Sequence, residues 1–249
     1  MTSTINLLRE LELDGLRQCL VQMKELGDPQ LETGLPILNR LLEAEADHRR
    51  RLKVQTLSRR AHFRYQSTLA SVLTGPERNL EKSLILRLSE GRWIKEGQNL
   101  LITGPTGVGK SYLASALGQQ ACRLGLKTVY HNCGKLWPTL KQARTRDRFE
   151  REINAIAKAD LLVLDDFGLN KLDASDRLAF LEILEDRWGR ASTLVVSQRP
   201  LANWHEVLGD PTVADAICDR LFSNSEKIEL KGDSLRRYPP KLDLNLPPS

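Results

Sequence analysis

A run of glycines that ends in lysine and serine carries the clearest chemistry in the chain. Residues 104–111 read GPTGVGKS and match the phosphate-loop spacing GxxxxGK[ST]. In such a loop backbone N–H groups turn toward phosphate oxygens, the lysine reaches the β and γ phosphates, and the serine hydroxyl ligates magnesium. A glycine turn without a ligand is the alternative. We predict that a nucleotide is bound by Gly104, Pro105, Thr106, Gly107, Val108, Gly109, Lys110, Ser111 and Tyr112.

Two adjacent aspartates supply the acidic partner that a phosphate loop needs. The run LLVLDDFG places Asp165 and Asp166 after four apolar residues, at the C-terminal edge of a buried strand, where open α/β sheets bind ligands. We predict that Asp165 holds the magnesium together with Ser111, directly or through water. Asp166 is predicted to orient or deprotonate a water that attacks the γ-phosphate. A cap on the following segment is the alternative for Asp166, because glutamate is commoner in the hydrolytic role.

Three more polar residues are candidates for catalysis beside Lys110 and Asp166. Ser197 and Gln198 follow the apolar run TLVV and are placed to contact the γ-phosphate or the attacking water, with a turn hydrogen bond as the alternative. Arg220 lies in VADAICDRLF, at the edge of the apolar stripe of a predicted helix. Such an arginine can reach a neighbouring subunit's nucleotide and stabilise charge in the transition state. A surface ion pair is the commoner role.

Short apolar runs separated by helical stretches must position these residues. The runs occupy residues 99–103, 127–131, 161–165, 193–197 and 227–230. Runs of this length between helices predict the buried strands of a mostly parallel α/β sheet. In residues 1–65 the leucines repeat at helical spacing instead, which predicts a small helical unit before the sheet.

The end of that helical unit is strongly basic. Residues 49–65 hold seven arginines and lysines and no acid. If the window is one helix, Arg49, Lys53, Arg60 and Arg64 line one stripe, beside Arg50. A row of cations suits the phosphate backbone of DNA, whereas a solvated helix face usually includes acids for pairing.

A second basic stripe lies between the second and third predicted strands. In one predicted helix over 141–156 the residues Lys141, Arg144, Arg148 and Arg151 share a face, and apolar residues share another. We predict a second DNA contact at this face. An ion pair between Arg148 and Glu152 is the alternative.

Composition limits the class of protein. The 249 residues are 41% hydrophobic and 28% charged, which excludes a disordered chain, and no apolar run approaches the roughly 20 residues that span a bilayer. The four cysteines form no CxxC pair and the chain starts unlike a signal peptide, so we expect a cytoplasmic protein without a membrane. We divide it into a helical N-terminal DNA-binding domain (1–66), a linker (67–78), an ATPase domain (79–232) and an extended tail (233–249).

Five segments in this order resemble the IstB-like transposition helper ATPases of the AAA+ superfamily, which are related to the helicase loader DnaC and the initiator DnaA. The segments are the phosphate loop, LLVLDDFG, TLVVSQRP, VADAICDRLF and GDSLRR at 232–237. The resemblance implies a P-loop fold with a five-stranded parallel sheet in the order 5-1-4-3-2, and ATP bound between subunits of a homo-oligomer. It implies that Asp165 and Asp166 form the Walker B pair, that Ser197 or Gln198 is sensor 1, and that Arg220 is an arginine finger.

The same resemblance implies a function in DNA transposition. The expected protein assembles on double-stranded DNA, hydrolyses ATP with Mg²⁺ and cooperates with a transposase of the same element. A DnaC-like loader of a replicative helicase is the main alternative, and a small-molecule kinase is the alternative from another class. Only residues 232–249 follow the sheet, so little or no helical lid is expected, and Arg236 or Arg237 would have to substitute for its sensor 2 arginine.

Overall fold

The chain forms two compact units, residues 1–57 and 58–249. The computed structural model describes residues 2–27 and 34–235. The division falls before the boundary predicted at residue 66, because residues 58–66 pack with the second unit. For example, the amide of Gln119 donates to the carbonyl of Tyr65 at 2.8 Å.

The N-terminal unit is helical, as its leucine spacing predicts. Helices α1 (Thr2–Glu10) and α2 (Asp14–Glu25) precede α3 (Gly34–Ala61), whose last turn belongs to the second unit. A buried carboxylate joins α2 to α3, because Glu45 accepts the backbone N–H of Leu16 at 3.1 Å in the first turn of α2. Gly15 permits this approach: a Cβ there would lie 2.5 Å from the Cβ of His48.

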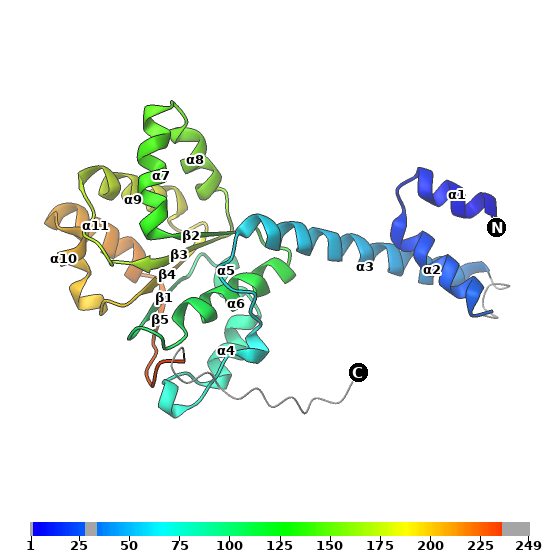
Figure 1. Ribbon diagram of the computed structural model, residues 1–249, viewed down its shortest axis with the longest axis horizontal. Helices are drawn as coiled ribbons and strands as arrows, with labels where there is room; N and C mark the ends of the chain where they lie inside the picture. The colour runs from blue at the N-terminus through cyan, green and yellow to red at the C-terminus, as the bar shows by residue number, and fades with distance from the viewer. Residues whose placement is uncertain (1, 28–33, 236–249) are drawn as a thin grey trace. The chain divides into compact units, whose positions relative to one another are not determined.

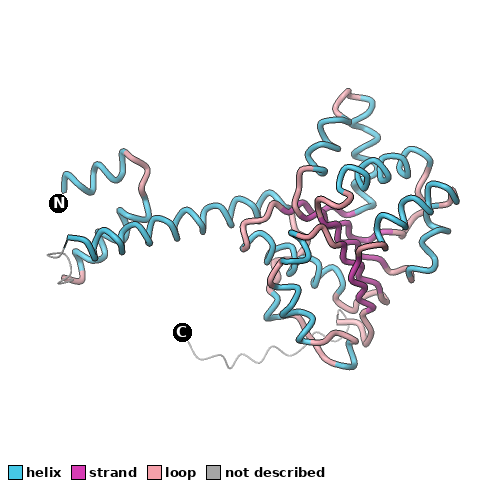
Figure 2. Tube along the Cα trace, turned by 180° about the vertical axis from the view of Figure 1, so that it is seen from behind, coloured by secondary structure: helices cyan, strands magenta, loops and turns pink. Residues whose placement is uncertain are grey.

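The second unit is built on a parallel sheet in the order β2-β3-β4-β1-β5, which confirms the expected 5-1-4-3-2. The strands are β1 (Asn99–Thr103), β2 (Thr128–Asn132), β3 (Leu161–Phe167), β4 (Ser192–Ser197) and β5 (Ser225–Glu229). They form a continuous band flanked by helices (Figure 2). Burial on both faces explains why the strands are read as apolar runs rather than as alternating patterns.

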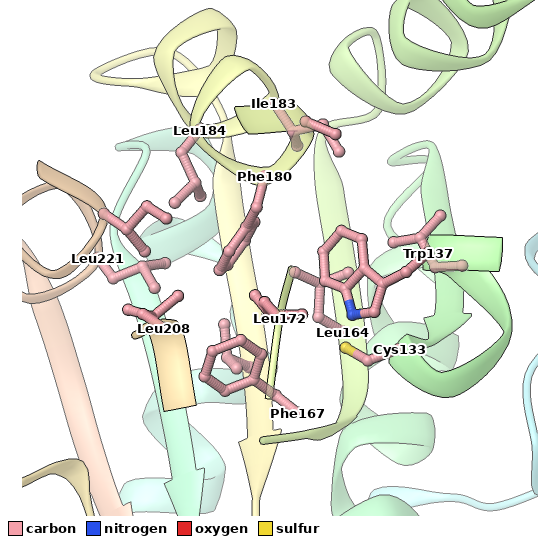
Figure 3. Close-up of a cluster of buried hydrophobic side chains, with 14 of the residues drawn as sticks. Cys133, Trp137, Leu164, Phe167, Leu172, Phe180, Ile183, Leu184, Leu208 and Leu221 are labelled. Carbon is pink, nitrogen blue, oxygen red and sulfur yellow. The ribbon is translucent and has the colours of Figure 1, made fainter. Parts of the chain in front are cut away.

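Helices cover both faces of this sheet (Figure 1). One face carries α4 (Lys82–Ser89), α5 (Arg92–Lys95) and α6 (Lys110–Arg123), and the other carries α7 (Cys133–Thr145), α8 (Phe149–Ala157), α9 (Ala174–Arg187), α10 (Trp204–Leu208) and α11 (Pro211–Phe222). In the second layer the ring of Phe180 on α9 lies 5.5 Å from those of Trp137 on α7 and Phe167 on β3 (Figure 3). These rings fix the end of β3, where the predicted acids lie.

The helix predicted over 141–156 is wrong, since two helices, α7 and α8, occupy this region. Asp147 adopts a left-handed conformation (φ 55°), its N–H binds the carbonyl of Arg144, and the N–H of Arg148 binds the carbonyl of Ala143. This pair of hydrogen bonds is a Schellman motif, which ends a helix. The predicted basic stripe is therefore divided between α7 and α8.

The segment 67–78 packs on the second unit rather than forming a free linker. It contains the 3₁₀ turns η2 (Leu69–Ser71) and η3 (Pro76–Arg78). Ser67 is buried and its hydroxyl donates to the carbonyl of Tyr112 at 3.2 Å, while the buried Arg78 reaches the phosphate loop. No helix occurs in residues 230–235 after β5; the remainder of the predicted tail lies outside the described residues.

A buried arginine connects α9 to the first residues of β4. The side chain of Arg187 is 1% exposed and donates to the carbonyls of Ile156, Ala159 and Ser192 and to the hydroxyl of Thr193. Burial lowers its pKa to about 10. The guanidinium satisfies backbone groups that no water can reach.

Replacing this residue should therefore cost stability. Arg187→Met removes the donors and leaves several buried carbonyls unpaired, so we expect the free energy of unfolding to fall by about 3 kcal/mol in urea denaturation followed by circular dichroism. The control Arg190→Met alters an exposed arginine nearby and should change it by less than about 0.5 kcal/mol. Equal midpoints for the two variants would refute the role of Arg187.

Candidate functional site

The predicted phosphate loop joins the end of β1 to the start of α6. Gly104, Gly107 and Gly109 have φ angles of 141°, 89° and 94°, which non-glycine residues rarely adopt. A Cβ on Gly107 would lie 2.1 Å from the hydroxyl of Ser234, and the N–H of Leu235 donates to the Gly107 carbonyl at 3.0 Å. The loop thus has the backbone of a phosphate cradle, with residues 232–235 packed against it.

The lysine and serine of the loop lie at the N-terminus of α6, where helix dipole and N–H groups favour an anion. The ammonium of Lys110 donates to the carbonyls of Gly104 and Pro105 at 2.8 and 2.7 Å. The hydroxyl of Ser111 donates to Oδ1 of Asp165 at 2.8 Å. The loop motif and the acidic strand, 54 residues apart, therefore meet at one place.

The remaining loop residues have structural contacts as well. Val108 is buried, and its carbonyl accepts a hydrogen bond from Arg78. The hydroxyl of Tyr112 shares a hydrogen bond of 2.9 Å with the hydroxyl of Ser71. Arg78, which also donates to the carbonyl of Asp233, was missed from the sequence because it lies in the segment predicted as a linker.

The two predicted acids end β3 in different environments. The Asp165 side chain is fully buried, whereas 20% of the Asp166 side chain is exposed. Asp166 has a left-handed φ of 58°, which turns it away from the regular alternation of the strand. The buried acid accepts the hydroxyl of Tyr130 and the exposed acid accepts the amide of Asn132 at 2.7 Å.

Tyr130 and Asn132 are site residues that the sequence analysis missed. They lie two apart on β2 and so share a face, and β2 pairs with β3 with Asn132 opposite Asp165. The spacing of Tyr130 and Asn132 in the strand TVYHN could have indicated that both side chains lie on one face of the sheet. Only the order of the strands shows that they lie beside the acids of β3. Burial and the charge of Asp165 raise the pKa of Tyr130, so it stays a hydrogen-bond donor.

Arg64 also belongs to this site, contrary to its predicted place on a basic helical stripe. Helix α3 ends at Ala61 and His62 has a positive φ of 56°, so Arg64 leaves the helical face. Its Nη1 lies 3.2 Å from Asp165 Oδ2 and 2.8 Å from Asp166 Oδ2. Burial opposes its charge, but the hydrogen bond to Asp165 and the charges of both acids outweigh burial and raise its pKa.

The donor set fits magnesium bound together with a nucleotide. A hydroxyl and carboxylates are the oxygen ligands that Mg²⁺ prefers, and the ion usually takes phosphate oxygens and waters besides one or two carboxylates. Within residues 2–27 and 34–235 no group of three or more His, Cys, Asp or Glu side chains could hold a metal. Ser111 and Asp165 would therefore hold the ion together with the phosphate oxygens of the nucleotide.

The end of β4 separates the roles of the two candidates there. The Ser197 hydroxyl is buried, donates to the carbonyl of Phe167 at 2.8 Å and accepts the N–H of Arg199 at 3.0 Å. Gln198 instead accepts the hydroxyl of Thr106 in the phosphate loop at 2.6 Å. Ser197 makes the turn contacts considered as the alternative, and Gln198 is the one that faces the loop.

Arg220 lies near the N-terminal end of β1, whereas the phosphate loop follows the C-terminal end of that strand. Its carbonyl accepts the amide of Asn99, the first residue of β1, at 3.0 Å, and the loop follows the last residue of that strand, about 13 Å away. Its guanidinium donates to Glu185 at 2.8 Å and to the carbonyl of Ala216 at 2.9 Å. The structure therefore contains the surface ion pair that was the alternative role for Arg220. The phosphate loop of the same chain lies at the other end of β1.

Two of the predicted DNA contacts on α3 have acidic partners. Arg49 lies 2.6 Å from Glu45, and Arg50 lies 2.5 Å from Asp47. These acids precede the acid-free window by one helical turn, so a count inside the window missed them. Lys53 and Arg60 are exposed on the same helix.

The second predicted DNA face is also partly paired. Lys141 on α7 lies 2.5 Å from Asp173 and 3.2 Å from Asp176, and the guanidinium of Arg144 lies 4.0 Å from the ring centre of Phe149. Arg148 and Arg151 are exposed at the start of α8.

Two other expectations concern the tail and membranes. Arg236 and Arg237 lie outside the described residues. In the part of the chain that the structure describes, no helix is both long enough and apolar enough to span a bilayer.

Comparisons with known proteins place these features in a family. The model of the family described as IstB-like ATP binding protein matches residues 6–241. A putative insertion sequence ATP-binding protein of Sinorhizobium fredii is 40% identical over 94% of this chain and 96% of its own length, and a putative ATP-binding protein of insertion sequence IS1162 from Pseudomonas fluorescens is 36% identical over 79% and 86%. The crystal structure of DnaI has a TM-score of 0.57 at 22% identity, covering 67% of this chain and 92% of that one, which indicates a shared fold. The chain belongs to the IstB-like ATP-binding proteins.

Proposed function

We propose that this protein is an ATPase that helps DNA transposition: it assembles on double-stranded DNA with ATP, cooperates with a transposase and hydrolyses the nucleotide. One observation carries the enzymatic part, namely that Lys110, Ser111, Asp165 and Asp166 converge at one edge of the sheet. The printed names of the relatives, which are insertion sequence ATP-binding proteins, support the transposition part.

The residues divide the work of hydrolysis by their position. Backbone N–H groups of the phosphate loop, to which Pro105 contributes none, and the ammonium of Lys110 bind the β and γ phosphates. Ser111 and Asp165 hold Mg²⁺, which neutralises charge on the phosphates when it is bound. Gln198 reaches the loop from β4 and contacts the γ-phosphate or the attacking water.

Asp166 is the group that we assign to the attacking water. Its side chain is partly exposed at the end of β3, next to the buried Asp165, and so can contact a solvent molecule. Asn132 binds its Oδ2, which leaves Oδ1 to orient the water and to accept its proton.

The trans role of Arg220 rests on its distance from its own phosphate loop. An arginine anchored at the start of β1 is one strand length from the loop at the end of β1, so it serves the nucleotide of a neighbouring subunit. The ion pair with Glu185 holds the side chain partly exposed, ready to exchange the carboxylate for a phosphate.

Loss of the loop lysine should abolish both nucleotide binding and assembly. Lys110→Ala removes the charged donor, so we expect affinity for ATP to fall at least about 100-fold in calorimetry. With a non-hydrolysed ATP analogue and duplex DNA, the wild-type chain should sediment as an oligomer and the variant should not. The control Lys158→Ala alters an exposed lysine at the end of α8 and should behave as wild type.

The same preparations discriminate the rival functions. Normal ATP affinity in Lys110→Ala, or a wild-type oligomeric state that ignores DNA, would refute this proposal. Co-purification with a replicative helicase instead of a transposase would favour the loader. Phosphate transfer to a small acceptor without DNA-stimulated hydrolysis would favour the kinase.

Arg220→Ala should keep ATP binding and lose hydrolysis, by up to about 1,000-fold, because charge in the transition state is left without its cation. Mixing Arg220→Ala with Lys110→Ala should restore hydrolysis, because an interface needs nucleotide only in the subunit that receives the arginine. The intact loop of the first variant binds ATP, and the second variant, which cannot assemble alone, offers it an intact Arg220. The matched control is a mixture with the double variant Lys110→Ala/Arg220→Ala, which has no finger to offer. Equal hydrolysis rates in the two mixtures would rule out action in trans.

The exposed cations of α3 should contribute to DNA affinity through phosphates. Lys53→Gln/Arg60→Gln should flatten the slope of log affinity against log salt by up to about 0.9 for each lost contact. Lys95→Gln/Arg123→Gln removes two exposed cations elsewhere and serves as the control. Arg49 and Arg50 should contribute less, because Glu45 and Asp47 already pair with them. A slope shared by the double variant and wild type would leave α3 as a solvated helix.

A further inference from the structure

The guanidinium of Arg64 binds the acid that the metal requires, Asp165, and its neighbour Asp166. Nη1 of Arg64 lies within hydrogen-bond reach of Oδ2 on both Asp165 and Asp166, at 3.2 and 2.8 Å. Asp165 is fully buried, so its charge needs a partner whenever no metal is present. The guanidinium supplies that partner for both carboxylates at once.

The backbone on each side of Arg64 is fastened to the ATPase unit. Phe63 packs edge-on against the ring of Tyr130, with 6.1 Å between ring centres, and fills the space beside Gly118, where a Cβ would lie 2.4 Å from the Phe63 ring. The carbonyl of Tyr65 accepts the amide of Gln119. These contacts hold the backbone of Arg64 at this site, so a change of partner requires only its side chain to move.

We propose that the guanidinium of Arg64 and Mg²⁺ are mutually exclusive partners of the Asp165 carboxylate, and that the nucleotide-bound metal must displace Arg64 to enter. This inference rests on the proposed binding of Mg²⁺ and ATP. It assigns Arg64 to control of metal entry rather than to DNA contact.

Electrostatics makes the two partners exclusive. Mg²⁺ binds oxygens at about 2.0–2.1 Å, so an ion on Asp165 would lie only a few ångströms from a guanidinium bonded to the same carboxylate. Two cations that close repel strongly where water is excluded. Mg²⁺ has the larger charge, and the nucleotide supplies it with phosphate oxygens as further ligands. In the wild-type chain the ion therefore displaces Arg64 from the carboxylate only when it is bound to the nucleotide.

The structure also provides space for the displaced side chain. A cavity of about 480 Å³ is lined by Tyr130 and Asn132, which bind the two acids, and by Arg64 itself together with His62, Lys135 and Glu152. The Arg64 side chain is already 37% exposed there. The Glu152 carboxylate on the cavity wall is an alternative partner for the guanidinium once the metal has entered.

The metal dependence of nucleotide affinity tests this exclusion. Arg64→Met keeps the length of the side chain and removes its charge, and Arg123→Met alters an exposed arginine of α6 as the control. In calorimetry with a non-hydrolysed ATP analogue, we expect the ratio of the dissociation constant in EDTA to that in Mg²⁺ to rise about tenfold in Arg64→Met and to stay at the wild-type value in the control. An unchanged or smaller ratio would overturn the proposal, because Arg64 would then act beside the metal.

Two measurements make the result independent of hydrolysis and of nucleotide affinity. Mg²⁺ alone should raise the melting temperature of Arg64→Met more than that of wild type, whereas equal shifts would count against the exclusion. In the wild-type chain, phenylglyoxal should modify Arg64 faster when the analogue and Mg²⁺ are bound than with analogue in EDTA, as read by mass spectrometry. Protection of Arg64 under the first condition would overturn the proposal even if Arg64→Met failed to fold. Loss of ATP binding by wild type would instead refute the proposed function, while the Mg²⁺ melting shift could still be read.

Discussion

The buried carboxylate of Asp165 is the constraint on which the candidate site depends. A charge with no exposed surface must be paired, and three groups from separate parts of the chain pair it: the hydroxyl of Ser111, the hydroxyl of Tyr130 and the guanidinium of Arg64. These contacts tie α6, β2 and the segment after α3 to the end of β3. The fold around the site therefore shields the carboxylate of Asp165 from solvent and leaves it in contact with a cation.

The surrounding packing serves that arrangement. Aromatic rings from α9 and α10 pack against Phe167, which follows the two acids on β3. On the other side of the sheet, Leu113 and Leu117 of α6 are buried, so the helix that begins with Lys110 cannot shift without opening a cavity. Rigid packing on both faces gives a site whose moving parts are side chains.

Sequence reasoning reached the features that are local in the chain. The strands were placed to within a few residues, since β1 lies at 99–103 as predicted and β3 extends two residues past 165. The phosphate loop and the acids carry their signal in adjacent residues. Tyr130 and Asn132 were not predicted as site residues, because their role comes from the pairing of β2 with β3. Arg64 was not predicted there because the helical pattern was extended past Ala61, where the backbone turns. The break at Asp147 escaped for a similar reason: a non-glycine residue in a left-handed conformation has only a weak sequence signal.

The position of Arg220 has a consequence for symmetry. The phosphate loop lies at the C-terminal ends of the strands and Arg220 near their N-terminal ends. Under the proposed action in trans, the surface that receives an arginine therefore differs from the surface that donates one. Where each of these surfaces meets a different neighbour, the contact is heterologous. Copies joined in this way all point in one direction, and they form either a closed ring or a helix with distinguishable ends. In an open assembly the subunit at one end has no donor for its nucleotide, so the two ends would differ in the rate at which they hydrolyse ATP.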